Sequence, residues 1–83
     1  MEALDGNAIA GLLHELFGRD MTLAAGVCDH CGDERVLAEA TVYVRAPGVV
    51  VRCRVCGEVL AVLAQVRTVN CVDLSGLRQI AHP

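Results

Sequence analysis

The sequence contains no lysine and no tryptophan, and it has one phenylalanine and one tyrosine among 83 residues. A chain of this length forms one domain, and it buries only about 60–65% of its unfolded surface. The hydrophobic fraction is 54%, but with so few rings the core has to be built from small aliphatic side chains. Such a core is marginal by itself, which favours an additional cross-link such as a metal ion.

Long apolar runs are also missing. The longest covers residues 59–64, which is strand length and far below the 18 or more residues of a membrane span. Residues 1–5 are acidic and lack the basic and apolar regions of a secretion signal, so we expect a cytoplasmic protein. Paired cysteines in a cytoplasmic chain indicate metal binding rather than disulfides. Arginine without lysine, together with much Ala, Val and Gly, favours a bacterial source with a GC-rich genome.

Positive charge is scarce, and it is unevenly placed. The net charge is −3, with eight acids and two arginines giving −6 over residues 1–40, and two acids and five arginines giving +3 over residues 41–83. An acidic chain is a poor general binder of nucleic acid, because phosphate contacts supply most of that affinity. The basic half nevertheless keeps a local nucleic-acid surface as an alternative.

Four of the five cysteines form two C-x-x-C-G motifs, at residues 28–32 and 53–57, with 21 residues between the inner cysteines. Two intervening residues let both sulfurs of a pair reach one ion from a tight turn, at about 2.3 Å for zinc. The glycine after each pair can adopt a positive φ, which lets backbone N–H groups point toward the sulfurs. We therefore predict one structural metal ion, expected to be zinc, held by Cys28, Cys31, Cys53 and Cys56.

An amphipathic helix is predicted over residues 6–17, because apolar residues recur there at the helical period. Asp5 is a suitable N-cap, Leu4 and Ile9 are spaced as a hydrophobic staple, and Gly18 fits the C′ position. A helix this short has to dock on something. Its apolar stripe either covers a small sheet or forms a surface for a partner or a second copy, and it consists of Ile9, Leu12, Leu13, Leu16 and Phe17.

Strands are predicted on either side of the cysteine motifs. Period-two alternation indicates a strand over residues 36–44 and a return strand over 49–54, with Ala46-Pro47-Gly48 as the turn. A short segment over 21–27 leads into the first motif, and an apolar strand over 58–66 follows the second. The expected fold is a small metal-stabilised α+β domain with a three- to four-stranded antiparallel sheet and an N-terminal helix.

Three segments of one domain follow from this pattern. Residues 1–20 carry the helix, residues 21–67 carry the metal-binding strands and turns, and residues 68–83 form a C-terminal strand or short helix. The last segment is ambiguous, since residues 69–74 fit a strand, whereas Leu74, Leu77 and Ile80 are spaced for a short helix interrupted by Gly76.

The two cysteine turns, here called knuckles, and the strands between and after them resemble the zinc-ribbon superfamily over residues 21–66. This resemblance implies a four-cysteine zinc ribbon, with zinc clamped between two turns at one end of a small sheet, but it does not choose a function. The spacing also resembles rubredoxin, in which four cysteines hold iron for electron transfer. Arg54 stands where rubredoxin-like knuckles usually carry proline, and the chain is only 2% aromatic, so zinc is favoured over iron.

The whole chain further resembles a family of small bacterial proteins of unknown function. The matching residues are Leu-Asp-Gly-Asn-Ala at residues 4–8 and Cys-Val-Asp-Leu at residues 71–74. That resemblance implies an accessory role beside a flavin- or molybdenum-dependent oxidoreductase.

The remaining cysteine, the histidines and the arginines have simpler interpretations. Cys71 lies too far from the second knuckle to join it, and we expect it to pack as a small hydrophobe. The alternatives are a reactive thiol, a swapped metal ligand or an intermolecular link. His30 and His14 are expected to face solvent, and His82 lies in the tail. The arginines of the basic half are expected on a solvated sheet face, or else to contact phosphates or an acidic partner, and they are Arg45, Arg52, Arg54 and Arg67.

Three functions are consistent with these residues. Four cysteines close the coordination of a metal and leave no position for water, so we favour a non-enzymatic module that binds a protein partner or a second copy. Its contact surface would be the helix stripe or the hairpin residues Arg52 and Arg54. The alternatives are a nucleic-acid-binding zinc ribbon and a rubredoxin-like iron electron carrier.

Overall fold

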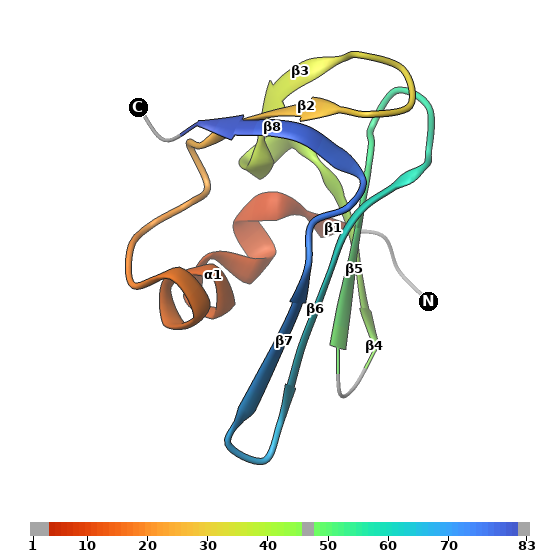
Figure 1. The fold of residues 1–83 in the computed structure, drawn as a ribbon. Coiled ribbons are helices and arrows are strands. Elements are labelled where there is room, and N and C mark those ends of the chain that lie inside the picture. The colour runs from red at the N-terminus through yellow and green to blue at the C-terminus, as the bar shows by residue number, and fades with distance from the viewer. Residues whose placement is uncertain (1–3, 46–47, 82–83) are drawn as a thin grey trace.

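The computed structural model describes residues 4–45 and 48–81 of the chain. In these residues an N-terminal helical segment and eight strands form a small α+β structure (Figure 1). The strands make two antiparallel sheets, one of five strands in the order β1-β4-β5-β6-β7 and one of three in the order β3-β2-β8. The antiparallel arrangement is as predicted, but the expected single sheet of three to four strands is wrong, because the segments before the first knuckle and in the C-terminal tail build a second sheet.

The five-stranded sheet is formed mainly by two consecutive hairpins. Its strands are β1 (Leu4–Asp5), β4 (Thr41–Arg45), β5 (Gly48–Arg52), β6 (Val59–Val66) and β7 (Val69–Asp73). The predicted hairpin of β4 and β5 is confirmed, with Tyr43 paired to Val50, while residues 46–47 of its turn lie outside the described residues. The apolar strand β6 lies inside the sheet between β5 and β7, as its composition indicates.

The three-stranded sheet consists of β2 (Ala25–Cys28), β3 (Glu34–Val36) and β8 (Leu77–Ala81). The C-terminal tail therefore supplies one strand to each sheet, β7 to the larger and β8 to the smaller. Of the two predictions for this tail, the strand is found and the helix over Leu74 to Ile80 is not. The reason is local, since the N–H of Gly76 donates to the carbonyl of Leu60 in β6 and turns the chain from one sheet to the other.

The N-terminal helix begins as a 3-10 turn, η1 (Gly6–Ile9), and continues as α1 (Ala10–Phe17). Asp5 is the N-cap, accepting from the N–H of Asn7 at 3.0 Å, and Gly18 ends the helix at φ +73°. Leu4, the predicted staple partner of Ile9, pairs with Val42 of β4. The cap and the stop were thus predicted correctly, and the tighter first turn was not.

The strand predicted over residues 36–44 is interrupted by a second 3-10 turn, η2 (Leu37–Glu39). The chain has to change sheets here, because β3 pairs with β2 whereas β4 pairs with β5. The N–H groups of Leu37 and Ala38 donate to the carbonyls of Ala24 and Thr22, which fixes the crossover. Residues 21–24 accordingly form a turn in which Met21, Thr22 and Ala24 are buried and Leu23 is exposed, so β2 is shorter than the predicted segment 21–27.

The core lies between one face of the five-stranded sheet and the helical segment, which Figure 1 shows beneath the small sheet. It is made of small aliphatic residues, as the composition predicts, and the sheet contributes Val42, Val49, Val51, Ala61 and Leu63. No helix in the described part of the chain is both long enough and apolar enough to cross a membrane.

The predicted helix stripe faces this core. Ile9 and Leu13 are only 6% and 2% exposed, and Leu12, Leu16 and Phe17 are partly buried against the same cluster. The stripe thus covers the sheet of its own chain, which was the simpler of the two interpretations offered by the sequence. Ile9 and Leu13 offer almost no surface to a partner.

Candidate metal centre

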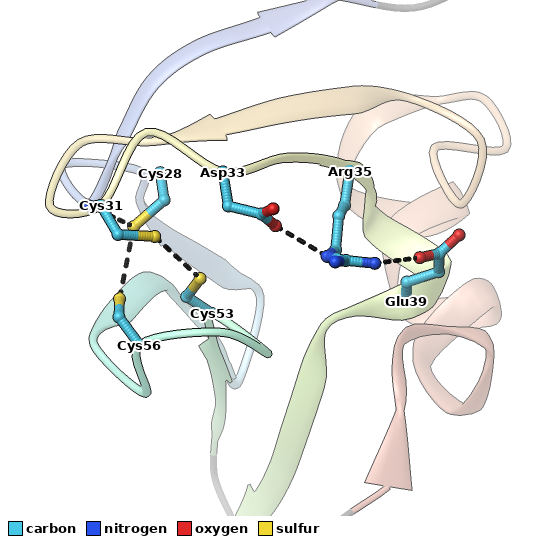
Figure 2. Close-up of polar contacts among 7 residues, drawn as sticks. All are labelled: Cys28, Cys31, Asp33, Arg35, Glu39, Cys53 and Cys56. Atoms are coloured by element: carbon cyan, nitrogen blue, oxygen red, sulfur yellow. Dashed lines mark hydrogen bonds and ion pairs between the residues drawn. The ribbon is translucent and has the colours of Figure 1, made fainter.

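The two knuckles are the turns of two hairpins that belong to different sheets. Residues 28–32 connect β2 to β3 in the small sheet, and residues 53–57 connect β5 to β6 in the large sheet. Both turns lie at the same end of the molecule, where the sheets meet, and Figure 2 shows their four sulfur atoms facing one another. A single ion at this point would join the two sheets.

The knuckles share one backbone conformation. The N–H of Gly32 donates to the carbonyl of Cys28, and the N–H of Gly57 donates to that of Cys53, both at 2.9 Å. Both glycines have φ +79°, a conformation that costs residues with a Cβ about 1–2 kcal/mol. The glycine after each cysteine pair therefore closes the turn, as predicted from the sequence.

A β-bulge lies next to each knuckle. The register shifts between Val27 and Cys28 where β2 meets β8, and between Val51 and Arg52 where β5 meets β6. The bulge in β6 accommodates Leu60 as an additional residue, so that Leu60 and Ala61 are both buried. Bulges redirect side chains and increase strand twist, and the additional residues here, Arg78 in β8 and Leu60 in β6, each lie beside a knuckle.

The sulfur atoms have the spacing that a tetrahedral ion needs. The four Sγ atoms all lie within 4.8 Å of one another, and the distances Cys28–Cys56 and Cys31–Cys53 are both 3.7 Å. Metal–sulfur bonds of about 2.3 Å in a tetrahedron place sulfurs about 3.8 Å apart. The cluster can therefore hold one metal ion, and since all five cysteines of the chain carry free thiols, no disulfide competes for these sulfurs.

The surroundings of the cluster shift the pKa values of Cys28 and Cys56 in opposite directions. Burial raises the pKa of Cys28, but backbone hydrogen bonds from Cys31 and His30 outweigh it and bring the pKa down to about 7. At Cys56 the backbone contact of Glu58 lowers the pKa, but burial and the other three sulfurs raise it to about 12. Four sulfurs this close repel one another as thiolates, and a divalent cation removes that repulsion.

The C-terminal tail holds the first knuckle against the second hairpin. Gly76 accepts from the N–H of Asp29 in the first knuckle at 2.9 Å, and donates to Leu60 beside the second knuckle at 3.1 Å. Arg78 adds a hydrogen bond from Nη2 to the carbonyl of Cys28 at 3.3 Å. Sequence reasoning missed this role of the tail, although the turn dipeptide Ser75-Gly76 marked a change of direction there.

Arg35 braces the first knuckle from its other side (Figure 2). Its Nε donates to Asp33 at 2.7 Å and its Nη1 donates to Glu39 at 2.8 Å. Asp33 belongs to the loop after Gly32, and its carbonyl accepts from the N–H of Cys28. The ion pairs thus tie the loop of the first knuckle to η2.

The arginines assigned to a shared surface are separated by the structure. Arg52 ends β5, donates to the carbonyl of Gly57 at 2.9 Å and lies 5.9 Å from the centre of the Tyr43 ring. We expected Arg54 to lie on the same sheet face as Arg52. It is instead exposed in the second knuckle, beyond the end of β5. Arg67 is exposed in the turn after β6, at the far end of that strand from the knuckle, and Arg45 is the last residue of β4.

Cys71 corrects a second expectation. It is exposed on β7, an edge strand, and therefore does not pack as a small hydrophobe. It does not belong to the cluster of four sulfurs. His30 and His14 are both exposed, as expected, and His82 lies outside the described residues.

The comparisons with known proteins identify a family. The model of DUF6510, described as a family of unknown function, matches residues 1–83. The chain belongs to this family. Neither the curated proteins nor the solved structures contain a match to it.

Proposed function

We propose that the chain is a non-enzymatic, cytoplasmic zinc module whose single metal ion is structural and whose surface binds another protein chain. The observation that supports the metal assignment is the set of four sulfurs, within 4.8 Å of one another, that two matching turns from two sheets present to one point. Four cysteine ligands complete a tetrahedron and leave no place for substrate or water. Free thiols in such a cluster suit a reducing compartment.

The residues around the four sulfurs favour zinc over iron as the bound metal. Tetrahedral thiolate coordination fits both metals. Arg54 replaces the proline typical of rubredoxin-like knuckles, and the chain has only one Phe and one Tyr with which to cover an iron centre. The electron-carrier alternative would require a coloured, redox-active iron protein.

A nucleic-acid-binding ribbon has less support. Arg35, Arg52 and Arg78 each have a hydrogen bond to another residue of the chain. Arg54 and Arg67 lie at opposite ends of β6, so they do not form a continuous basic surface. Phosphate recognition generally uses several cations along one face.

The experiment is elemental analysis of the purified protein, followed by circular dichroism during titration with a zinc chelator. We expect one zinc ion per chain and loss of the β-sheet signal as the ion is removed, because metal binding and folding are coupled in small domains of this kind. A protein that stays folded after complete removal of the metal would contradict a structural role. One iron per chain, with visible colour, would support the electron carrier instead.

A further inference from the structure

The four edges of the two sheets differ in how well they are protected. Long, flat, uncharged edges attract other strands, so proteins shorten them, charge them or cover them. Edges β1 and β3 have only two and three residues, and edge β8 carries Arg78. Edge β7 has five residues, all exposed, with Asp73 at its end as its one charged residue.

The backbone of β7 has unpaired groups at alternate positions. A two-residue turn, Arg67-Thr68, joins β6 to β7, and Val66 pairs with Val69 across it. Such a turn is closed by a hydrogen-bonded pair, and hydrogen-bonded pairs alternate along an antiparallel ladder. The N–H and C=O groups of Asn70 and Val72 therefore point away from β6, toward a side on which the described residues place no further strand.

The sheet face beside this edge is mainly apolar, with Asp73 as the charged residue that β7 contributes to it. Side chains of Val62, Val66 and Val69 lie on the face opposite the core and are 39%, 45% and 60% exposed. Cys71 lies on the same face of β7, paired with Ala64. An apolar face next to an open strand edge suits a protein strand and offers nothing to a phosphate.

We propose that two copies of the chain associate by antiparallel pairing of their β7 strands, with the two-fold axis at Cys71. This inference rests on the protein-binding part of the proposed function and names its partner. In this register Asn70 of each copy pairs with Val72 of the other, so the outward backbone groups of both residues are satisfied. A two-fold interface uses the same surface of both copies. β7 can form one because Cys71 is its middle residue, so an axis at Cys71 pairs the two residues before it with the two residues after it in the other copy.

The register centred on Cys71 is favoured by length and by charge. It pairs all five residues of β7, whereas a shift in either direction leaves residues of the strand unpaired. It also places each Asp73 opposite Val69 of the other copy, so the two carboxylates lie about 13 Å apart along the strands. At that separation, ordinary salt screens most of their repulsion. On the outer face, Val66 and Val69 of each copy then lie beside Asp73 of the other, with the two Cys71 residues between them.

The test is sedimentation equilibrium of the metal-loaded protein under reducing conditions, over a range of concentrations. We expect a dimer that dissociates on dilution, because five paired residues form a small interface. Val72→Pro removes an N–H that β6 does not use, so the hairpin should survive while pairing between copies is blocked. Val72→Thr has nearly the same shape and keeps the N–H, so it should dimerise like the wild type.

The outcomes separate the proposals. Monomeric Val72→Pro with one metal per chain, beside dimeric Val72→Thr, would support pairing through β7. A wild-type protein that is monomeric at all concentrations would overturn the inference, yet one zinc per chain would leave the metal assignment standing. A dimer that persists in Val72→Pro but is lost in Val62→Glu would also overturn it, because the sheets would then associate face to face.

Disulfide formation between the Cys71 residues of two copies tests the register of the β7–β7 pairing. Opposed residues of a non-hydrogen-bonded pair have Cα atoms about 4.5 Å apart, which is within the range for a disulfide. Oxidised glutathione would accept two electrons from two Cys71 thiols, forming the intermolecular disulfide and two molecules of reduced glutathione. We expect a covalent dimer in the wild type and none in Cys71→Ser. A non-covalent dimer without this product would overturn the register.

Discussion

The two knuckles have the same local structure and different surroundings. Each has a glycine at φ +79° whose N–H donates to the carbonyl of the first cysteine. In each, the N–H of that cysteine donates to the carbonyl of the residue directly after the glycine, which is Asp33 for Cys28 and Glu58 for Cys53. Around the first knuckle, however, the described residues add contacts of Gly76 and Arg78 and the Arg35 ion pairs, whereas around the second they add the hydrogen bond of Arg52 to Gly57.

This difference shows that the two knuckles are held in position by different kinds of contact. The second knuckle joins two long strands, β5 and β6, that lie inside the larger sheet and are fixed by their neighbours. The first joins β2 to β3, which has only three residues, so its position depends on contacts from the tail and from η2. We infer that the large sheet presents two sulfurs by itself and that the small sheet has to be held in place.

The largest effect is expected from removing a sulfur from either knuckle. Cys28 and Cys53 are 2% and 4% exposed, and each supplies one corner of the tetrahedron. Cys28→Ser and Cys53→Ser should each lose the metal and unfold the domain, at a cost of more than about 5 kcal/mol, because metal binding contributes folding free energy. Metal content by mass spectrometry and thermal unfolding measure both effects.

Cys71→Ser is the matched control for this pair. Its sulfur lies on an exposed edge strand outside the cluster, so it should keep one metal per chain and nearly the wild-type stability. Full metal occupancy in Cys53→Ser would contradict equal roles for the two knuckles.

Metal affinity should fall as the pH falls. Metal binding requires thiolates, and the pKa values of Cys56, at about 12, and of Cys31, which is also raised, leave both thiols protonated near neutral pH. Binding should therefore release at least about two protons per ion, and affinity should fall about tenfold per pH unit for each proton released. Calorimetry in buffers of different ionisation enthalpy counts these protons. An affinity that is constant between pH 6 and 8 would show that the thiolates are already formed.

The knuckles could be predicted from sequence because their geometry is local. The C-x-x-C-G spacing contains both the ligand positions and the positive-φ glycine, and the Asp5 cap and Gly18 stop of the helix are equally local. The β4–β5 hairpin also followed from the alternation of apolar residues over residues 41–52.

The second sheet could not be predicted in this way, because it depends on contacts between distant residues. Apolar residues keep a period of two at positions 36, 38, 40, 42 and 44, straight through η2, so this pattern does not show that the chain changes sheets there. The bulge at Leu60 depends on pairing between residues 7 and 10 positions apart, Arg52 with Val59 and Val51 with Ala61. The return of the tail to Cys28 depends on residues 49 and 50 positions away, Leu77 and Arg78. The exposure of Cys71 likewise depends on β7 being the last strand of its sheet, which composition does not reveal.

Gly76→Ala tests whether the tail positions the first knuckle. A Cβ at Gly76 would overlap the carbonyl oxygen of Val59, so the turn would have to move away from β6 and from Asp29. We expect a loss of about 2–3 kcal/mol in stability, together with weaker metal binding. Gly11→Ala is the control, since its Cβ would meet nothing within 4 Å on the helix surface, and it should be neutral or stabilise by up to about 1 kcal/mol.

The smallest effect, and the sharpest comparison of the knuckles, comes from Gly32→Ala and Gly57→Ala. Both positions have φ +79°, so each substitution should cost about 1–2 kcal/mol of backbone strain. A Cβ at Gly57 would meet nothing within 4 Å, whereas one at Gly32 would touch Nη2 of Arg78 at 3.4 Å. Chemical denaturation should therefore give nearly equal losses in an Arg78→Ala background. In the wild-type background a larger loss for Gly32→Ala would show that the Arg78 contact contributes to holding the first knuckle, and equal losses in both backgrounds would show that it does not.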